Sequence, residues 1–509
     1  MLATVYSSSV IGIDAYTVEV EVDISRGLPS FSTVGLAEGA VRESKERVKA
    51  ALKNSGYDFP ADRITVNLAP ADVKKEGSAF DLPIAVGILT ATGLIPPLAL
   101  KDCLIMGELS LDGSVRPIRG ALSMAIMAKE FNLKGIYVPS TNAAEAAVVD
   151  GIAVYPTNTL SQLVESLNDM ESITPLTVDR NRLGDTLSSD LDFADVCGQE
   201  NVKRAVEIAA AGGHNLLMIG PPGAGKTMLA QRLSTILPSL AFNEALETSK
   251  VYSVMGLMPR GQGLLTRRPF RAPHHTISDA GLIGGGVIPK PGEVSLAHNG
   301  VLFLDEMPEF KKNVLEVLRQ PMETGIVTIS RANSTVTYPA NFVLVGAMNP
   351  CPCGFFGDTK HECTCSHREI RRYRAKISGP LMDRIDIHID VPSVPFKDLT
   401  GISQGESSFT IYQRVQAAKK IQEKRFHKTK IHSNAMMNSR QIKKFCPIDE
   451  NSTALLETAM EKFGLSARAL SRILKISRTI ADLAGAQDIE QTHVAEAIQY
   501  RSLDRKLMV

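Results

Sequence analysis

Apolar and polar residues recur along the first part of the chain in the patterns of strands and amphipathic helices. Residues Tyr16–Ile24 alternate apolar and acidic side chains, which is typical of a half-buried strand. Over Glu38–Asn54 the apolar residues fall on one helical face. Ile64–Leu68 and Gly135–Val138 read as further short strands. The pattern predicts that residues 1–170 form a domain of their own that mixes helices and strands.

An uncharged run over Leu82–Leu100 has the length of a short membrane span. Pro83, Gly87 and Gly93 interrupt it, and two adjacent prolines follow at residues 96 and 97. Because proline ends a helix, the run predicts a buried helix followed by a turn, with no membrane association.

The rest of the chain divides by composition into three further segments. Residues 171–192 turn polar, which indicates a linker. Over residues 193–395 strands alternate with helices, the signature of a mostly parallel sheet. Residues 396–509 begin with a polar stretch and continue as helical, basic-rich sequence. The pattern therefore predicts an α/β protein whose central block carries a helical domain behind it.

Composition and charge set few limits on function. The chain has 509 residues and a net charge of +1, so any nucleic-acid surface must be local. Four of the seven cysteines crowd between residues 351 and 365, whereas a secreted disulfide framework would spread them more evenly. The first residues lack the basic n-region of a signal peptide. These features predict a protein of the reducing cytoplasm.

A glycine-rich loop follows the short apolar strand Asn215–Ile219 and precedes a predicted helix. In this strand–loop–helix context, backbone N–H groups curl around phosphate oxygens, and the helix N-terminus adds its positive dipole end. Lys226 is expected to reach the β and γ phosphates of ATP, and Thr227 to supply an oxygen to Mg²⁺. The predicted phosphate loop consists of Gly220, Pro221, Pro222, Gly223, Ala224, Gly225, Lys226 and Thr227.

Two further apolar strands end in residues that suit nucleotide hydrolysis. Val301–Leu304 leads into Asp305, which is expected to hold Mg²⁺ at the carboxyl end of a parallel strand. Glu306 then stands where it can polarise the attacking water. The strand Phe342–Met348 ends in Asn349, which is expected to orient that water as a sensor.

The cysteine cluster has the form C-x-C…C-x-C, with Gly354 and Gly357 between the pairs so that the loop can fold back. Four thiolates around one tetrahedral Zn²⁺ are the simplest interpretation, although C-x-C is tighter than the usual spacing. His361 and His367 are possible substitute ligands, and an iron–sulfur cluster or four free thiols are the alternatives. The predicted ligands are Cys351, Cys353, Cys363 and Cys365.

Three motifs of the central block are highly specific: Arg268–Thr276 (RPFRAPHHT), Pro291–Gly300 (PGEVSLAHNG) and Met348–Gly354 (MNPCPCG). They resemble the helix-insert branch of AAA+ ATPases, which includes magnesium chelatase motor subunits and the MCM replicative helicases. Within that branch the chain is similar, over essentially its whole length, to the magnesium-chelatase-like proteins of the YifB/ComM family. The resemblance implies an AAA+ P-loop core with a helical lid, assembled as a homo-hexameric ring.

The resemblance also implies two catalytic arginines. Gly379–Asp386 is similar to an arginine-finger segment, so Arg384 would reach the γ-phosphate of a neighbouring subunit. Ser466–Ala469 is similar to the second sensor of the lid, so Arg468 would contact phosphate. From the residues alone, a surface ion pair is the favoured role for each.

Two segments resemble the hairpins that line the pore in this branch, Ala280–Glu293 and Ile326–Tyr338. Lys290 and Arg331 are the expected contacts to DNA phosphates, and solvated loop tips are the alternative. Two further stretches are rich in basic residues: residues 367–376 and 414–430. Clustered cations of this kind bind DNA backbones without reading sequence, and a solvated helix face is the alternative.

The first domain resembles the Lon-protease-like α+β domain, with a ribosomal S5 domain 2-like fold, that opens this family. Ser78 stands in the place of the Lon nucleophile, and Leu122 stands where its lysine partner is expected. A serine without its base is a poor nucleophile, so a recruited scaffold is expected and not a peptidase. Lys74 and Lys75 lie nearby in the sequence and leave that point open.

The resemblance implies an ATP-driven helicase that acts on single-stranded or branched DNA. It would promote branch migration when incoming DNA is integrated during natural transformation, with recombination proteins as possible partners. The alternative is a chelatase-type ATPase that remodels a partner protein for metal insertion into a porphyrin. The first domain separates the two, since chelatase motor subunits are not expected to carry a Lon-like leader. A third interpretation, an ATP-dependent protease, is opposed by the missing lysine.

Overall fold

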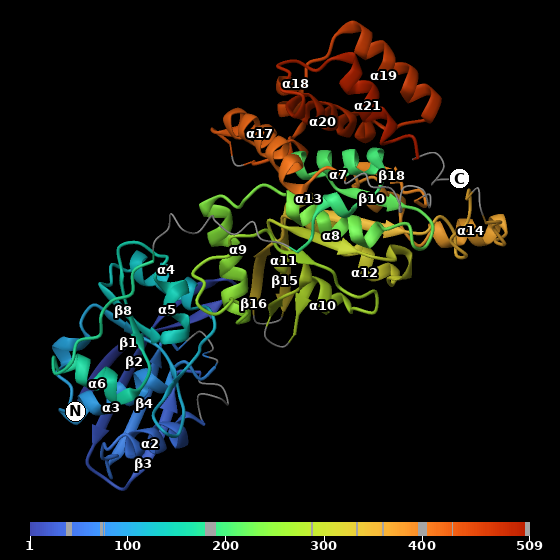
Figure 1. Cartoon of the computed structure of the whole chain (residues 1–509). Helices are drawn as coiled ribbons and strands as arrows, with labels where there is room; N and C mark the ends of the chain where they lie inside the picture. Colours follow the sequence, from blue (N-terminus) through green and yellow to red (C-terminus); the bar gives the residue numbers. More distant parts are fainter. Residues whose placement is uncertain are drawn as a thin grey trace. The chain divides into compact units, whose positions relative to one another are not determined.

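The computed structural model describes most of the chain, and its residues divide into two compact units (Figure 1). The first unit comprises residues 1–184 and 241–266, and the second comprises residues 185–240 and 267–509. The start of the helix predicted at Glu38, Lys74 and residues 179–189 of the predicted linker lie outside the described residues. The described ranges are 1–36, 43–71, 75, 77–178, 190–286, 289–331, 334–358, 361–394, 405–429 and 431–503.

The first unit is built on a seven-stranded mixed sheet with the order β3-β4-β2-β1-β5-β8-β9. The pairs β1–β2 and β2–β4 are antiparallel, whereas the remaining neighbours run parallel. The alternation at residues 16–24 places Val18, Val20 and Val22 in the core. The strands are β1 (Leu2–Ile11), β2 (Asp14–Ser25), β3 (Ser30–Val34), β4 (Arg63–Ala69), β5 (Cys103–Ile105), β8 (Gly135–Pro139) and β9 (Ala153–Thr157).

Helices cover this sheet, and the uncharged run forms the most buried of them. Every residue of α3 (Asp81–Ala91) is buried, and the chain then turns through the short helix η1 (Pro97–Leu100). The prediction of a buried helix followed by a turn is therefore confirmed. Within the described part of the chain, no helix has the length and apolarity needed to cross a bilayer. The other helices are α2 (Ser44–Asn54), α4 (Ala121–Glu130), α5 (Ser140–Ala146) and α6 (Leu160–Leu167).

One helix of the first unit comes from the middle of the chain. Helix α9 (Phe242–Met255) packs on α4, and the Gly120 backbone N–H donates to the carbonyl of Ser253 at 2.9 Å. Lys250 forms an ion pair with Asp14 at 2.5 Å. The sequence analysis had assigned this segment to the central block, because its composition does not differ from that of the helices around it.

The second unit contains a five-stranded sheet in which all strands run parallel, with the order β11-β14-β17-β10-β18. All residues of β10 and β14 are buried, which explains their continuous apolar sequence. The predicted mostly parallel α/β sheet is confirmed. The strands are β10 (Leu216–Ile219), β11 (Phe270–Arg271), β14 (Val301–Leu304), β17 (Val343–Met348) and β18 (Ile387–Asp390).

Short helices flank this sheet, and the chain leaves it to form two hairpins. The hairpins are β12 (Gly284–Gly285) with β13 (Lys290–Pro291), and β15 (Ile326–Arg331) with β16 (Ser334–Pro339). The helices near the sheet are α7 (Glu200–Gly212), α8 (Lys226–Ile236), α10 (Asp279–Ile283), α11 (Glu293–Leu296), α12 (Lys312–Glu316), α13 (Arg319–Thr324), α14 (His367–Arg374) and α15 (Gly379–Met382).

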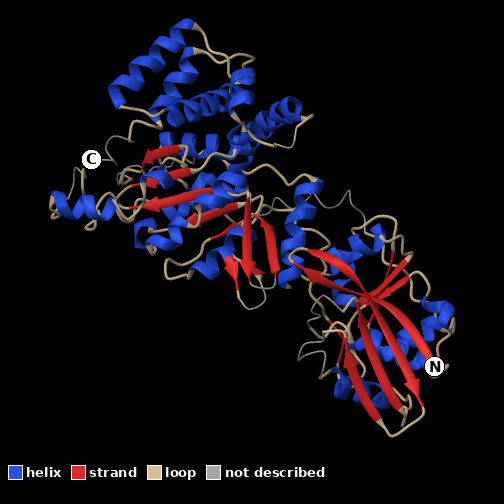
Figure 2. Cartoon of the chain, turned by 180° about the vertical axis from the view of Figure 1, so that it is seen from behind, coloured by secondary structure: helices blue, strands red, loops and turns tan. Residues whose placement is uncertain are grey.

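The C-terminal part of the second unit is entirely helical where it is described (Figure 2). Helices α17 and α20 pack against α7, so one hydrophobic core runs from the sheet into this lid. The helices are α17 (Ser408–Phe426), α18 (Ser439–Phe445), α19 (Glu450–Phe463), α20 (Ala467–Leu483) and α21 (Gln491–Gln499).

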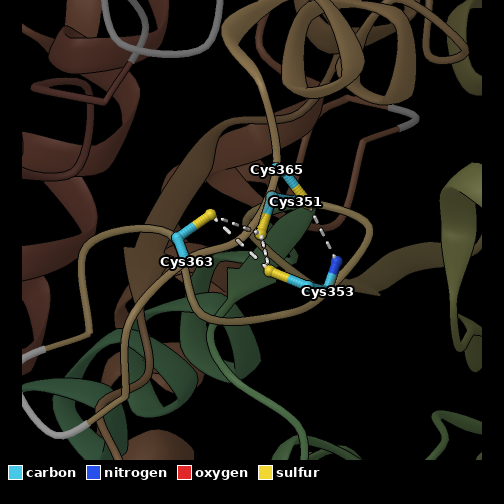
Figure 3. A group of neighbouring side chains, drawn as sticks. All are labelled: Cys351, Cys353, Cys363 and Cys365. Atoms are coloured by element: carbon cyan, nitrogen blue, oxygen red, sulfur yellow. Dashed lines mark hydrogen bonds between the residues drawn. The ribbon is translucent and has the colours of Figure 1, made fainter.

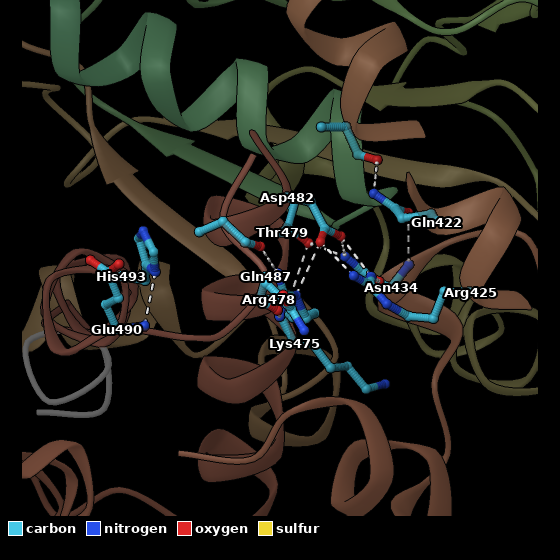
Figure 4. Close-up of polar contacts among 12 residues, drawn as sticks. Gln422, Arg425, Asn434, Lys475, Arg478, Thr479, Asp482, Gln487, Glu490 and His493 are labelled. Carbon is cyan, nitrogen blue, oxygen red and sulfur yellow. Dashed lines mark hydrogen bonds and ion pairs between the residues drawn. The ribbon is translucent and has the colours of Figure 1, made fainter. Parts of the chain in front are cut away.

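A buried carboxylate, Asp482, forms hydrogen bonds with several residues of the lid. The carboxylate of Asp482 accepts two hydrogen bonds from Arg425, at 2.5 and 2.7 Å, and one from Arg478 at 3.0 Å (Figure 4). Asn434 donates to the same carboxylate at 2.8 Å. A buried carboxylate costs several kcal/mol unless it is paired in this way.

This network changes the interpretation of the basic stretch at residues 414–430. Arg425 faces Asp482, and Arg414 donates to Glu207 at 2.5 Å. Lys419 is buried, and its amino group donates to the carbonyl of His432. Three of its cations are therefore engaged in contacts within the second unit, which weakens the prediction that this stretch forms a DNA-binding surface.

Candidate nucleotide site and cysteine cluster

The glycine-rich loop connects β10 to α8, as the strand–loop–helix pattern predicts. Gly223 and Gly225 have φ values of 76° and 86°, a region that favours glycine. A Cβ on Gly220 would lie 2.2 Å from the carbonyl oxygen of Val391 in the segment after β18. The positive φ values require glycine at residues 223 and 225, and the close approach of Val391 requires glycine at residue 220. Helix α8 begins directly after this loop, at Lys226.

The side chain of Lys226 points back into this loop. Its Nζ donates to the carbonyl oxygens of Gly220 at 2.7 Å and Pro221 at 2.9 Å, and to Asn349 Oδ1 at 3.1 Å. Burial lowers the pKa of Lys226 from its ordinary value, and the charges of Asp305 and Glu306 oppose that shift. The structure thus brings together the predicted phosphate-binding lysine and the predicted sensor.

A pair of oxygens suited to Mg²⁺ lies beside the lysine. The hydroxyl of Thr227 donates to Asp305 Oδ2 at 2.6 Å. Hydroxyl and carboxylate oxygens are the ligands that Mg²⁺ uses when it also binds phosphates. Asp305 directly follows β14 and Asn349 directly follows β17, and the two strands are parallel neighbours. The donor set therefore fits the cation.

Glu306 occupies a constrained position next to this pair. Its backbone has φ 50°, and its N–H donates to Asp305 Oδ1 at 2.9 Å. Its side chain is 60% exposed and reaches to within 3.7 Å of His275 Nδ1. His275 in turn packs edge-on against Phe310. The sequence analysis quoted His275 within a family motif and gave it no role, although its position four residues after β11 places it at the same edge of the sheet.

The two predicted arginines lie apart from this cluster within the chain. Arg384 follows α15, and its guanidinium donates to the carboxylate of Glu323 and to the carbonyl of Pro380. Arg468 is the second residue of α20 and is exposed. Among the described residues, neither side chain contacts the groups around Lys226. Their roles toward phosphate stay predictions.

The four clustered cysteines converge on one point (Figure 3). All four sulfur atoms lie within 4.8 Å of one another, and Cys351 Sγ is 3.3 Å from Cys353 Sγ and 3.7 Å from Cys363 Sγ. A backbone N–H of Phe355 holds the pKa of Cys353 down, at about 5, whereas burial and the neighbouring cysteines raise the pKa of Cys363 and bring that of Cys365 to about 12. Four sulfur donors at one centre fit a tetrahedral soft cation. The cluster can therefore hold a metal ion.

The two hairpins predicted to line a pore contact each other. The hydroxyl of Tyr338 in β16 donates to the carbonyl of Pro289 at 2.7 Å, and burial raises the pKa of Tyr338 to about 12. Arg331 Nη2 lies 3.4 Å from the position of a Cβ on Gly285. Both Lys290 and Arg331 are exposed. The tip at residues 332–333 and the turn at residues 287–288 lie outside the described residues.

The basic stretch at residues 367–376 keeps an exposed face. Arg368 and Arg372 of α14 are exposed. Arg374 instead turns inward, where its guanidinium lies over the ring of Phe356 at 5.2 Å and its Nε donates to the carbonyl of Pro350 at 3.2 Å. This helix therefore combines a surface of cations with contacts to the cysteine loop.

The predicted Lon-like positions lie in the first unit. The hydroxyl of Ser78 donates to the carboxylate of Glu108. Leu122 is buried in α4, where its N–H donates to the hydroxyl of Ser253 in α9 at 3.4 Å. Lys75 is buried, and Lys74 and Glu76 lie outside the described residues. The absence of peptidase activity stays a prediction.

Three family models match the chain. They are the magnesium chelatase subunit ChlI at residues 192–399, a model described as subunit ChlI of Mg-chelatase at residues 20–142, and the ChlI C-terminal model at residues 405–501.

Known proteins match along most of the chain. Competence protein ComM of Haemophilus influenzae is 46% identical, covering 99% of this chain and 98% of that protein. The protein YifB of Escherichia coli is 42% identical, covering 100% of this chain and 98% of its own. The magnesium-chelatase 38 kDa subunit of Rhodobacter capsulatus is 27% identical, covering 31% of this chain and 50% of its own. The chain therefore belongs to the YifB/ComM family of magnesium-chelatase-like proteins, whose core has the AAA+ P-loop fold.

Proposed function

We propose that this protein is a hexameric, ATP-dependent DNA motor, a helicase that promotes branch migration during the integration of DNA. The observation that carries the proposal is the pair of touching hairpins, each with an exposed cation, that interrupt a nucleotide-binding sheet. The relative named competence protein ComM supports a role in competence. None of the seven cysteines, all of which lie in the described residues, forms a disulfide, which suits the reducing cytoplasm where we place this function.

Hydrolysis would use groups of one chain that already lie together. Lys226 would bind the β and γ phosphates, and Glu306 would polarise the attacking water that Asn349 orients. Thr227 and Asp305 would hold Mg²⁺, which supplies positive charge to the phosphate oxygens. The exposed Glu306 carboxylate beside a buried Lys226 supports this division of roles.

Assembly into a ring would bring a second positively charged side chain to the γ-phosphate. Positive charge on the γ-phosphate is worth several orders of magnitude in rate, and Arg384 lies away from the phosphate loop of its own chain. A neighbouring subunit that contributes Arg384 would complete the site. Arg468 of the lid would add a contact within the same chain.

The hairpins give the first test of the DNA function. Replacing Lys290 and Arg331 together with Ala should abolish DNA-stimulated ATP hydrolysis and branch migration, because the channel loses its phosphate contacts. Basal hydrolysis should persist. The slope of log affinity against log salt should become less steep by about two. The measurements are ATPase rates with single-stranded, duplex and branched DNA, and binding titrations at several salt concentrations.

The matched control for the hairpin variant is Arg440→Ala with Lys443→Ala. Both are exposed cations of the lid outside the two basic stretches, so this pair removes one arginine and one lysine from another surface. It should keep DNA stimulation. Normal branch migration by the hairpin double variant would refute the pore assignment.

The alternative function is a chelatase-type ATPase that remodels a partner for metal insertion. The model that matches residues 20–142 also carries the chelatase subunit's name, so the name alone does not separate the two functions. Coverage favours the DNA motor, because the chelatase subunit aligns with about a third of the chain and the competence protein with nearly all of it. ATP hydrolysis that no DNA stimulates would favour the chelatase-type function.

We further propose that the cysteine cluster holds structural zinc. Elemental analysis of the purified protein should find about one zinc ion per chain. Replacing Cys351 and Cys363 with Ser should remove it, whereas replacing Cys103 and Cys197, which lie outside the cluster, should not. A protein with neither zinc nor iron would contradict this proposal, and iron in place of zinc would favour an iron–sulfur cluster.

A further inference from the structure

We propose that the cysteine loop, residues 351–358 and 361–365, positions the nucleotide site, and that Gly354 is the positioning residue through which metal binding and nucleotide binding are coupled. The inference rests on the proposed ATP-dependent function and on the proposed metal. It goes beyond them, because it gives the metal a measurable effect on the phosphate loop.

The first connection is a direct contact between the two loops. Gly354 has φ 88°, and a Cβ built on it would lie 2.5 Å from Pro222 Cδ and 2.9 Å from Pro222 Cγ. Side chains do not tolerate such distances, so either loop would have to move if Gly354 carried one. Pro222 belongs to the phosphate loop, two residues after Gly220. The backbone of the cysteine loop therefore rests on the phosphate loop.

The second connection runs through the two ends of the cysteine loop. Asn349, whose Oδ1 accepts from Lys226, is two residues before Cys351. Helix α14 begins just after Cys365, and its Tyr373 forms a hydrogen bond with the Asn349 backbone, while burial raises the pKa of Tyr373 to about 12. Both ends of the loop therefore meet at the predicted sensor.

A third set of contacts joins α14 to the loop itself. Arg374 donates to the carbonyl of Pro350 at 3.2 Å and covers the ring of Phe356. The N–H of Phe356 donates to Cys351 Sγ at 3.3 Å. A metal that holds the four thiolates fixes this loop, and with it the surfaces that meet Pro222 and Asn349.

Coupling between two sites is reciprocal. If bound zinc tightens nucleotide binding by some factor, bound nucleotide must tighten zinc binding by the same factor. Typical couplings of this kind amount to about 5–150-fold. The contact at Gly354 therefore predicts two independent measurements, one at each site.

The first experiment compares two glycines of the same loop. Gly354 and Gly357 both have positive φ, 88° and 82°, so Ala strains the backbone at either position. Only Gly354 meets the phosphate loop, because a Cβ on Gly357 has nothing within 4 Å. With equal zinc content, Gly354→Ala should weaken Mg·ADP binding on the order of tenfold, within the range expected of such couplings. Gly357→Ala should bind as the wild type does.

A second substitution tests whether the effect is steric. Pro222→Ala removes the ring atoms that a Cβ at residue 354 would meet. In the Gly354→Ala background it should restore part of the lost affinity, and the double-mutant cycle measures that coupling. Equal Mg·ADP affinities of the zinc-loaded Gly354→Ala and Gly357→Ala variants would overturn the proposal.

The wild-type protein provides a test that needs no variant. Zinc affinity is measured by competition with a chromogenic zinc chelator, with and without saturating Mg·ADP. We expect nucleotide to raise zinc affinity by the factor by which zinc raises nucleotide affinity, and an unchanged zinc affinity would overturn the coupling. The proposed function fails separately: a wild type without zinc ends the metal proposal, and one that binds no nucleotide ends the ATPase proposal.

Discussion

Replacing Glu306 with Gln should leave nucleotide binding intact and lower the ATP turnover rate by about 10²–10⁴-fold, because the amide no longer polarises the attacking water. The carboxylate is exposed, and the hydrogen bonds of Lys226 go to Gly220, Pro221 and Asn349 instead, so binding should not depend on it. Turnover and Mg·ATP affinity are measured on the same preparation. Glu309→Gln is the matched control: it makes the same chemical change three residues later, at a side chain that pairs with Lys376, and it should keep full activity.

Lys226→Ala should have the opposite profile from Glu306→Gln. It removes the cation that is expected to meet the phosphates, so the nucleotide affinity itself should fall. The variant also leaves the carbonyl oxygens of Gly220 and Pro221 without this donor. Equal turnover by Glu306→Gln and the wild type would refute the assignment of the hydrolytic glutamate, whatever the result at Lys226.

The second large effect is expected at Arg384. If this side chain acts on the neighbouring subunit, Arg384→Ala should keep DNA binding and ring assembly while turnover falls by about 10³-fold or more. Within its own chain, however, Arg384 contacts Glu323. Glu323→Gln separates the two roles. If Arg384 matters only through this ion pair, Glu323→Gln should lower turnover as much as Arg384→Ala does. If Arg384 is an arginine finger, Glu323→Gln should lower turnover much less.

Mixed rings test the direction of the effect. Arg384→Ala subunits retain Glu306, and Glu306→Gln subunits retain Arg384. In a mixed ring, one kind of interface combines both intact groups, so part of the activity should return. Mass spectrometry of the intact assemblies verifies that mixed rings form. Mixed rings that recover no turnover would contradict the assignment of Arg384 as a finger.

The positions at the nucleotide site were predictable because a parallel sheet brings strand ends to one edge. Asp305 and Asn349 each follow a buried apolar strand, and the register of β14 and β17 places those strand ends together. The cysteine cluster was predictable from two closely spaced pairs. The chemical roles of these residues remain predictions.

Other features depend on partners far along the chain, which no local pattern reveals. Arg414 and Arg425 resemble solvated cations in the sequence, yet they face Glu207 and Asp482. His275 and Glu306 follow two strands and lie about 30 residues apart in the sequence. Their contact could be predicted only if the order of the strands in the sheet were known. In the sequence, Gly354 is only a glycine in a loop, and nothing there indicates its contact with the phosphate loop.

Residues 241–266 interrupt the sequence of the second unit but belong to the first, and this has a mechanical consequence. The chain passes from one unit to the other three times, after residues 184, 240 and 266. Two of these crossings connect to the region between α8 and β11, which are the phosphate-loop helix and an edge strand of the nucleotide-binding sheet. A force applied to the first unit is therefore transmitted by covalent bonds to the sheet that carries the phosphate loop. A fragment that begins after the linker would instead carry α9 without the surface that covers Ala245 and Val251.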